Sequence, residues 1–259
     1  MRGAQLKMYD ETLEPVAQTF LSAGSGDFLV PSFLRPNSTE LESSVNPQTG
    51  MSALRALAPG QMSEILPVVY LVRHGETAWS LTGQHTGLTN LPLTERGKRN
   101  ARRLGERLAG MAFAKVLTSP LQRAARTCEL AGFGAAAEVD RDLVEWNFGQ
   151  YEGLRTVEIH AKHPDWRLFR DGCPDGELPE QVGVRAEHVV SRARAIKGDV
   201  LIFSSGHFLR VLAARWLGLE PAAGRFFTLN TASVSVLGYE NTLAQPAIRL
   251  WNDTHHVGD

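Results

Sequence analysis

Short apolar runs alternate with amphipathic segments along the chain from residue 67 onward. The runs Val68–Val72 and Val200–Phe203 are unbroken and rich in β-branched or large apolar residues, which is typical of strands buried on both faces. Shorter strands are predicted at Lys115–Thr118 and Ala137–Val139. Two late strands are predicted at residues 233–237 and 247–251.

Between these strands the apolar positions follow a helical period. Thr94 is expected to cap a helix that runs to about Leu108. Ser119 and Pro120 are expected to open a second helix as its N-cap and first helical residue, and Gly132 to end it. Further helices are predicted over residues 156–163, residues 180–196 and the segment that starts near residue 205 and ends before Gly218.

This alternation of strands and helices predicts the fold class. Parallel strands need crossover helices, and those helices cover both faces of the sheet. We therefore expect an α/β protein with three layers, α/β/α, and a mostly parallel sheet with helices on both faces.

Residues 1–66 differ from the rest because they are rich in Ser, Gly and Pro and hold no persistent period. They are interpreted as a poorly ordered N-terminal extension, followed by a domain over residues 67–254 and a short tail over 255–259. A sharper hypothesis is that the extension is an artefact of gene-start assignment and that the native chain starts near Met62. N-terminal sequencing of the natively expressed protein tests it, and finding residues 1–61 in the mature chain would contradict it.

Composition narrows the class of protein. The 259 residues are 43% hydrophobic and 21% charged with a net charge of −1, so there is enough apolar material for a core and no global attraction to nucleic acid or membrane. No apolar stretch approaches the length of a membrane span, and the N-terminus lacks the pattern of a signal peptide. A cytoplasmic enzyme is expected. A run of arginines is interpreted as the solvated face of a helix: Arg96, Arg99, Arg102, Arg103 and Arg107.

Candidate chemistry follows three of the predicted strands. His74 comes directly after the first strand beside Arg73, and Gly75 is expected to let the chain turn tightly there. Arg123 follows the second strand, and His207 follows the central apolar strand. Because the carboxyl ends of parallel strands meet at one edge of the sheet, these groups are expected to converge. Two histidines and two arginines there would match a phosphate dianion, with helix N-terminal N–H groups adding to the site.

The chain resembles a known family, the histidine phosphatase superfamily, in its phosphoglycerate-mutase-like branch. The resemblance extends from Val68 to Trp251 and is carried, in the order of the family, by Arg73–Thr77, Ser119–Thr127, Glu145–Gly153 and Ser205–Arg210. Two further segments look like the group of fungal sedoheptulose-1,7-bisphosphatases and their bacterial relatives: Trp79–Thr89 and Arg170–Glu177.

The resemblance implies a role for each core residue. His74 would be the nucleophile and become a phosphohistidine. Arg73 and Arg123 would bind the phosphoryl oxygens, and His207 would hydrogen-bond the phosphoryl group from the other side. Glu145 would protonate the leaving alcohol and then activate water.

The resemblance also implies the contacts of the substrate, a small phosphorylated molecule. Thr86 and Gly87 look like the short loop that touches the phosphate and the near end of the substrate. No metal ion or other cofactor is needed, because the positive charge comes from side chains. Further substrate contacts are expected from Ser80, Gln84 and Phe208.

Some assignments have rivals in the sequence. Arg126 lies on the same helical turn as Arg123, but the arginine of the family motif falls at the position of Arg123. Glu152 is expected to hold the adjacent loop, since the catalytic glutamate of the family precedes the aromatic-glycine pair, as Glu145 does. His85 is interpreted as an ordinary loop histidine, with substrate contact as the alternative.

The residues around the core favour a phosphatase over a mutase. Mutases of this branch carry an arginine, a histidine and a tyrosine directly after the catalytic glutamate, and a long basic insertion that holds phosphoglycerate. Here the three positions are Trp146, Asn147 and Phe148. Loss of those contacts should let product leave and water enter, so the prediction is a metal-independent phosphomonoesterase.

The substrate and the alternatives stay open at this stage. The resemblance suggests a phosphorylated sugar, but Leu178 departs from the pattern of the bisphosphatase group at the entrance to the site. Alternatives are a phosphoglycerate mutase, a non-catalytic phosphate-binding module and an enzyme directed at phosphoprotein. Nothing in the sequence marks an interface, so the oligomeric state is also open.

Overall fold

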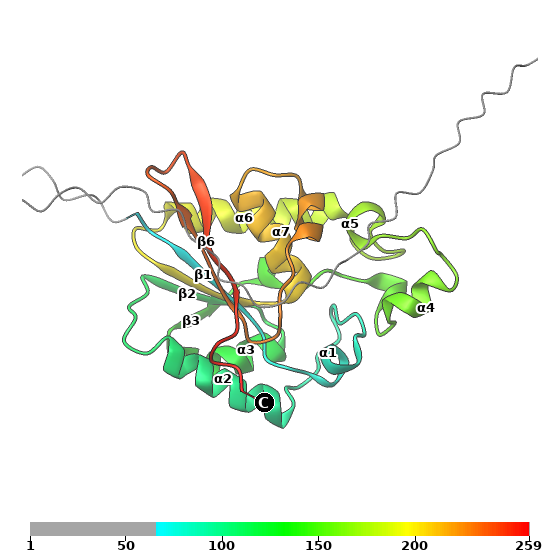
Figure 1. The fold of residues 1–259 in the computed structure, drawn as a ribbon, viewed down its shortest axis with the longest axis horizontal. Helices are drawn as coiled ribbons and strands as arrows, with labels where there is room; N and C mark the ends of the chain where they lie inside the picture. The colour runs from blue at the N-terminus through cyan, green and yellow to red at the C-terminus, as the bar shows by residue number, and fades with distance from the viewer. Residues whose placement is uncertain (1–65, 259) are drawn as a thin grey trace, which may run out of the picture. The chain divides into compact units, whose positions relative to one another are not determined.

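A computed structural model describes residues 66–258, in which six strands form one sheet (Figure 1). The predictions on residues 1–65, including the start near Met62, lie outside the described residues. The strand order is β3-β2-β4-β1-β5-β6. The strands are β1 Val69–Arg73, β2 Lys115–Thr118, β3 Ala137–Val139, β4 Val200–Ser204, β5 Val234–Tyr239 and β6 Pro246–Asp253.

The strands β1, β2, β3 and β4 are mutually parallel, whereas β5 runs antiparallel to both β1 and β6. The predicted mostly parallel sheet is therefore confirmed. The helices are α1 Ala78–Thr82, α2 Glu95–Arg107, α3 Gln122–Leu130, α4 Thr156–His160, α5 Leu168–Asp171, α6 Pro179–Ala195 and α7 Gly206–Trp216. Short 3-10 helices cover Gly134–Ala136, Arg141–Leu143, Gly149–Tyr151 and Pro221–Phe226.

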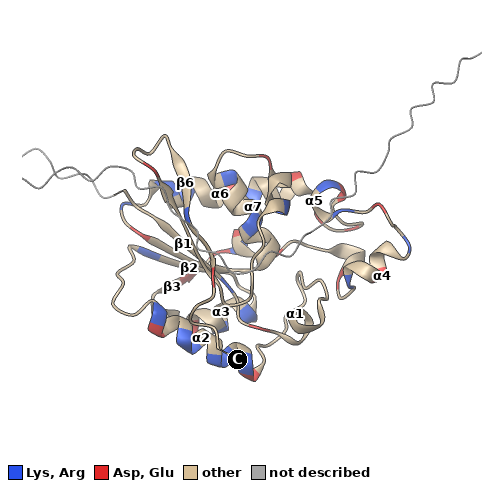
Figure 2. Cartoon of the chain, viewed as in Figure 1, with Lys and Arg blue, Asp and Glu red and all other residues tan. Residues whose placement is uncertain are grey.

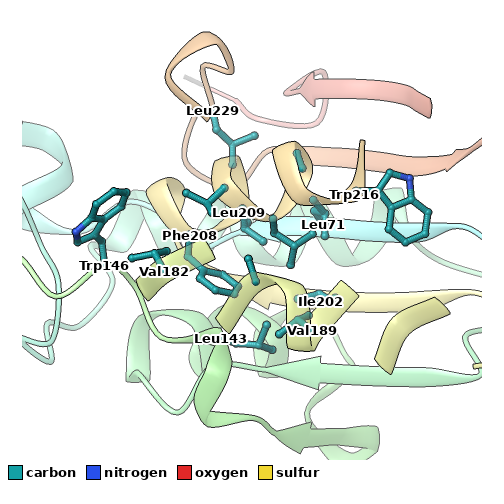
Figure 3. Packing of buried hydrophobic residues seen from close by; sticks show 14 of the residues in the cluster. Leu71, Leu143, Trp146, Val182, Val189, Ile202, Phe208, Leu209, Trp216 and Leu229 are labelled. Atoms are coloured by element: carbon teal, nitrogen blue, oxygen red, sulfur yellow. The ribbon is translucent and has the colours of Figure 1, made fainter. Parts of the chain in front are cut away.

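The central strand β4 explains why its sequence is apolar throughout. Leu201 and Phe203 point to one side, where they pack with buried residues of α2 and α3. Val200 and Ile202 point to the other side, where α6 and α7 cover the sheet. This second cluster is drawn in Figure 3 and includes Leu71, Val182, Val189, Phe208, Leu209 and Trp216. Helices on both faces confirm the three-layer architecture.

Two predicted helix boundaries were wrong. The helix expected to open at Ser119 begins instead at Gln122, because the N–H of Ser119 bonds to Phe203 O at 2.9 Å and continues the edge of the sheet. The helix expected over residues 156–163 ends at His160. Beyond it the N–H groups of Lys162 and His163 share one acceptor, Ile159 O, at 3.0 and 2.8 Å, so the regular ladder of the helix is not continued.

The turn after β1 is shaped by a close backbone contact. A Cβ atom on Gly75 would lie 2.7 Å from Gly97 O, and one on Gly97 would lie 2.3 Å from Glu76 O. Only glycine fits at both positions, so α2 packs directly against the turn that carries His74. Gly75 is thus required for the approach of α2, in addition to any role in the turn itself.

The arginines of α2 are exposed, as predicted, and Figure 2 marks the Lys and Arg positions along this helix in blue. All five are exposed to solvent: Arg96, Arg99, Arg102, Arg103 and Arg107. Among residues 66–258, no helix combines the length and the apolar character that crossing a bilayer requires.

Candidate active site

The three candidate groups meet at the carboxyl ends of three neighbouring strands. The N–H of His74, directly after β1, bonds to Ser204 O of β4 at 2.9 Å. The N–H of Ser119, directly after β2, bonds to Phe203 O at 2.9 Å. His207 lies in the first turn of α7, which follows β4. The predicted convergence at one edge of the sheet is confirmed.

His74 is buried and fixed in one orientation. Its Nδ1 lies 2.7 Å from Gly75 O, and because a carbonyl only accepts, Nδ1 carries the proton. Nε2 is then left with a lone pair. Burial, followed by the charges of Arg123 and Arg73, holds the pKa of His74 well below its ordinary 6.5. The imidazole is therefore neutral at physiological pH, the form in which it is a nucleophile.

Arg73 reaches from the end of β1 to the start of α7. Its guanidinium donates to Leu229 O and lies so close to Gly206 that a Cβ there would be 3.1 Å from Nε. Burial lowers the pKa of Arg73 to about 10, which still leaves it protonated at neutral pH. A positive charge is thus held at the N-terminus of α7, beside the site of His74.

Arg123 is completely buried and organises the loop that was predicted to touch the phosphate. Its guanidinium donates to the carbonyls of Thr86, Gly87 and Thr89 at 3.0, 2.7 and 3.0 Å. From the other side, Glu152 accepts from the N–H of Gly87 at 2.9 Å and from that of Thr89 at 3.1 Å. Glu152 thus holds the loop, as predicted, and Arg126 pairs with Glu129 at the surface.

Both arginines carry an unmatched donor. Within residues 66–258, no hydrogen-bond partner reaches the buried Nε of Arg73 or of Arg123. A buried donor without a partner costs about 1–3 kcal/mol, so such groups ordinarily meet a ligand or water. In the described part of the chain, no group of three His, Cys, Asp or Glu side chains is arranged to hold a metal ion.

Glu145 is buried and receives several backbone hydrogen bonds. Its carboxylate accepts from the N–H groups of Trp146, His207 and Phe208 at 2.9, 3.0 and 2.8 Å. Burial by itself would raise the pKa of Glu145, but the hydrogen bond and charge of His207 and the backbone N–H groups lower it below the ordinary value. The first N–H groups of α7, expected to face a phosphate, are thus occupied by this carboxylate.

His207 is surrounded by aromatic rings. The rings of Phe148, Phe169 and His85 lie 5.5, 5.8 and 5.9 Å from it, measured between centroids. Its Nδ1 is 3.6 Å from Oε2 of Glu145, and burial lowers the pKa of His207 against the effect of that carboxylate. His85 also packs on Phe148 at 4.7 Å, which places this histidine beside His207 rather than in an ordinary loop environment.

The remaining predicted substrate contacts already have partners within the protein. Ser80 forms a capping box with Thr77, in which its hydroxyl accepts from the N–H of Thr77 at 2.8 Å. Gln84 donates through Nε2 to Gly153 O at 2.7 Å. The side chain of Phe208 is fully buried in the core. Contact of these three residues with substrate stays a prediction.

Thr127 is a member of the site that the sequence did not single out. Its hydroxyl accepts from the N–H of Gly75 at 2.9 Å and donates to Arg123 O at 2.6 Å. It therefore links the turn of the predicted nucleophile to the helix that carries Arg123. Its position four residues after Arg123, on the same helical face, was the available signal.

Three histidines of the site, with His74 buried and His85 and His207 half-buried, make stability depend on pH. Burial lowers the pKa of His74 and His207 below 6.5 and that of His85 to about 4. As pH falls through about 6.5, each histidine gains a proton in the unfolded chain while it stays neutral in the folded chain, so stability is lost. From His85 alone we expect the free energy of unfolding to fall by about 1 kcal/mol when the pH is lowered from about 7.5 to about 5.5.

Urea denaturation at the two pH values measures this loss, and His85→Phe should reduce it. A denaturation midpoint that stays constant between the two pH values would show that the histidines are not held neutral by the fold.

Comparison with known proteins gives consistent matches. A model of a family described as histidine phosphatase superfamily (branch 1) matches residues 69–254. An acid phosphatase of Mycobacterium tuberculosis is 41% identical over 182 residues, which cover 69% of this chain and 89% of that protein. A sedoheptulose 1,7-bisphosphatase of Saccharomyces cerevisiae is 36% identical over 190 residues, covering 61% of this chain and 70% of that protein.

A solved structure of a protein from an open reading frame of Mycobacterium tuberculosis has the same fold. It superposes with a TM-score of 0.69 at 38% sequence identity. The match covers 73% of this chain and 98% of that one.

Proposed function

This chain belongs to branch 1 of the histidine phosphatase superfamily, and we propose that it hydrolyses phosphate monoesters through a phosphohistidine on His74, without a metal ion. Membership of this family, together with the similarity to an acid phosphatase and a sedoheptulose 1,7-bisphosphatase, supports a phosphatase. The observation that carries the proposed mechanism is a buried, neutral His74 beside two guanidinium groups whose Nε donors have no partner within residues 66–258.

In the first step, Nε2 of His74 attacks the phosphorus atom and the bond from phosphorus to the leaving oxygen breaks. Arg73 and Arg123 bind the phosphoryl oxygens and offset the charge that spreads over them in the transition state. Glu145, protonated when the substrate is bound, transfers its proton to the leaving alcohol. His207 stabilises the phosphoryl group from the other side.

In the second step, the carboxylate of Glu145 takes a proton from water while the water oxygen attacks phosphorus. The bond between phosphorus and Nε2 breaks, phosphate leaves, and His74 and Glu145 regain their starting forms. One group serves both steps because the proton lost in the first is regained in the second.

The charge of the substrate prepares Glu145 for the first step. In the free enzyme the surrounding N–H groups keep this residue ionised. A phosphate dianion bound beside it raises its pKa, because two like charges in a buried site cannot both be stable. Binding and proton uptake are therefore coupled.

Hydrolysis is favoured over mutase activity by the residues after Glu145. Trp146 and Phe148 are fully buried, and Phe148 packs against His207, so neither offers a polar group to retain phosphoglycerate. We propose a small phosphorylated metabolite as substrate, such as a sugar phosphate, in line with the similarity to a sedoheptulose 1,7-bisphosphatase. Residues 67–254 would form the catalytic domain and act in the cytoplasm, without nucleic acid or membrane as a partner.

Turnover of p-nitrophenyl phosphate with a chelator present tests the proposal. We expect phosphate release to continue undiminished in the chelator, because side chains supply the positive charge. A panel of sugar phosphates and phosphoglycerates then identifies the substrate class. Interconversion of 2- and 3-phosphoglycerate that is faster than phosphate release would contradict the assignment as a phosphatase.

A further inference from the structure

The segment from Cys173 to Glu177, which resembles a motif of the bisphosphatase group, lies directly on the loop that follows Glu145, residues 146–150. The N–H of Glu177 bonds to Asn147 O at 2.9 Å, and the indole N–H of Trp146 bonds to Glu177 O at 2.9 Å. The N–H of Gln150 bonds to Pro174 O, also at 2.9 Å. Three hydrogen bonds thus tie the two segments together along their length.

Two glycines allow this contact. A Cβ atom on Gly176 would lie 2.3 Å from Asn147 O, and one on Gly149 would lie 2.1 Å from Pro174 O. Gly149 also has a φ of 50°, which disfavours any other residue. The glycines at these positions are explained by the approach of the two backbones, without any contact with substrate.

Arg185 of α6 connects Glu177 to the main chain around Glu145. It forms a bidentate ion pair with Glu177, with Nε–Oε1 and Nη2–Oε2 distances of 2.8 and 2.9 Å. The same guanidinium donates to the carbonyls of Asp142 at 2.6 Å and Val144 at 3.2 Å, just before Glu145. It also donates to Glu145 O at 3.4 Å.

Glu177 holds the other side of the same loop. Its Oε2 accepts from the N–H of Asn147 at 2.8 Å, two residues after Glu145. The ion pair is largely shielded, since the side chains of Arg185 and Glu177 are only 17% and 19% exposed. Such a bidentate pair has a rigid geometry, so the main chain on both sides of Glu145 is fixed by it.

We propose that Glu177 and Arg185 are positioning residues that aim the carboxylate of Glu145 in both proton-transfer steps. They touch the main chain around Glu145 and not its carboxylate, so they act through it. This inference rests on the proposed function. A displacement of about 1 Å in a catalytic group can cost roughly 10²-fold in rate, so the pair has a direct effect on turnover.

Glu177→Gln tests the proposal because glutamine keeps the shape and an acceptor for Asn147 but removes the ion pair. With p-nitrophenyl phosphate, whose leaving group needs no acid, we expect the phosphorylation burst to stay close to wild type. Dephosphorylation needs the base, so kcat should fall roughly 10- to 100-fold and phosphohistidine should accumulate. With an alkyl phosphate, phosphorylation should also be slow and no phosphohistidine should build up.

Arg192→Gln is the matched control. Arg192 lies on the same helix and pairs with Asp140 at 2.6 Å and Asp142 at 3.0 Å, without reaching residues 144–147. Arg192→Gln should lower stability slightly and leave the ratio of the phosphorylation rate to the dephosphorylation rate unchanged. Arg185→Lys, which keeps the charge but not the planar fork, should show the same imbalance as Glu177→Gln in a milder form.

Two outcomes would overturn the inference. A wild-type enzyme that forms no phosphohistidine would remove the proposed function and the positioning role together. If the wild-type enzyme forms phosphohistidine, the positioning role alone would be removed by either of two results with p-nitrophenyl phosphate: Glu177→Gln and Arg185→Lys slow both steps equally, or they only lower Tm.

Discussion

Replacing His74 with alanine is expected to abolish hydrolysis of p-nitrophenyl phosphate, with kcat falling roughly 10⁴-fold or more. The nucleophilic nitrogen is lost, so no covalent intermediate can form. Only direct attack of water on the substrate remains, and that reaction is slow. Steady-state phosphate release measures the loss. Quenching under alkaline conditions, in which phosphohistidine survives, should detect the intermediate in the wild type and none in the variant.

His188→Ala is the control for this experiment. His188 lies on α6 with its side chain 60% exposed, so its removal should leave turnover and the intermediate unchanged. Circular dichroism should show that His74→Ala is folded. Substantial turnover in folded His74→Ala would mean that another group, or water itself, attacks the phosphorus atom.

Glu145→Gln is expected to trap the enzyme between its two steps. The amide cannot take a proton from water, so kcat should fall roughly 10²- to 10⁴-fold while p-nitrophenol is still released in the first turnover. A burst of p-nitrophenol equal to the enzyme concentration, followed by a slow steady rate, is the expected trace. Phosphohistidine should accumulate in parallel.

The substitution also has a structural cost. Both oxygens of the carboxylate accept hydrogen bonds from backbone N–H groups, so the amide nitrogen of glutamine must face one of these donors. A loss of about 1–3 kcal/mol in the free energy of unfolding is expected, and urea denaturation measures it. If the folded variant turns over at the wild-type rate, Glu145 is neither the acid nor the base.

Strands and long helices were predictable because their signal lies in consecutive residues. The ranges expected for β2 and β3 are those observed, and α6 differs by one residue at each end. The start of α3 was not predictable in this way. Ser119 and Pro120 have the chemistry of a helix start, but the neighbouring strand β4 binds the N–H of Ser119 and holds it in the sheet.

The same distinction applies to the residues of the site: a local motif identified some of them, and contacts between distant segments determine the surroundings of others. Arg123 was separable from Arg126 by its place in a motif, and the structure buries the first and exposes the second. The surroundings of His85 depend on rings contributed by three distant segments. The hydrogen bonds of Arg185 likewise depend on how α6 lies against residues 142–147, which no local pattern reports.

The placement of β4 has a consequence for how activity is lost. This strand is bonded on both edges, to β1 and β2, and covered on both faces, and its last carbonyls hold the backbone of His74 and Ser119. Its amide hydrogens should exchange with solvent deuterium only through opening of the whole domain. Denaturants should therefore inactivate the enzyme in the same cooperative transition that unfolds it, with no inactive but folded species between.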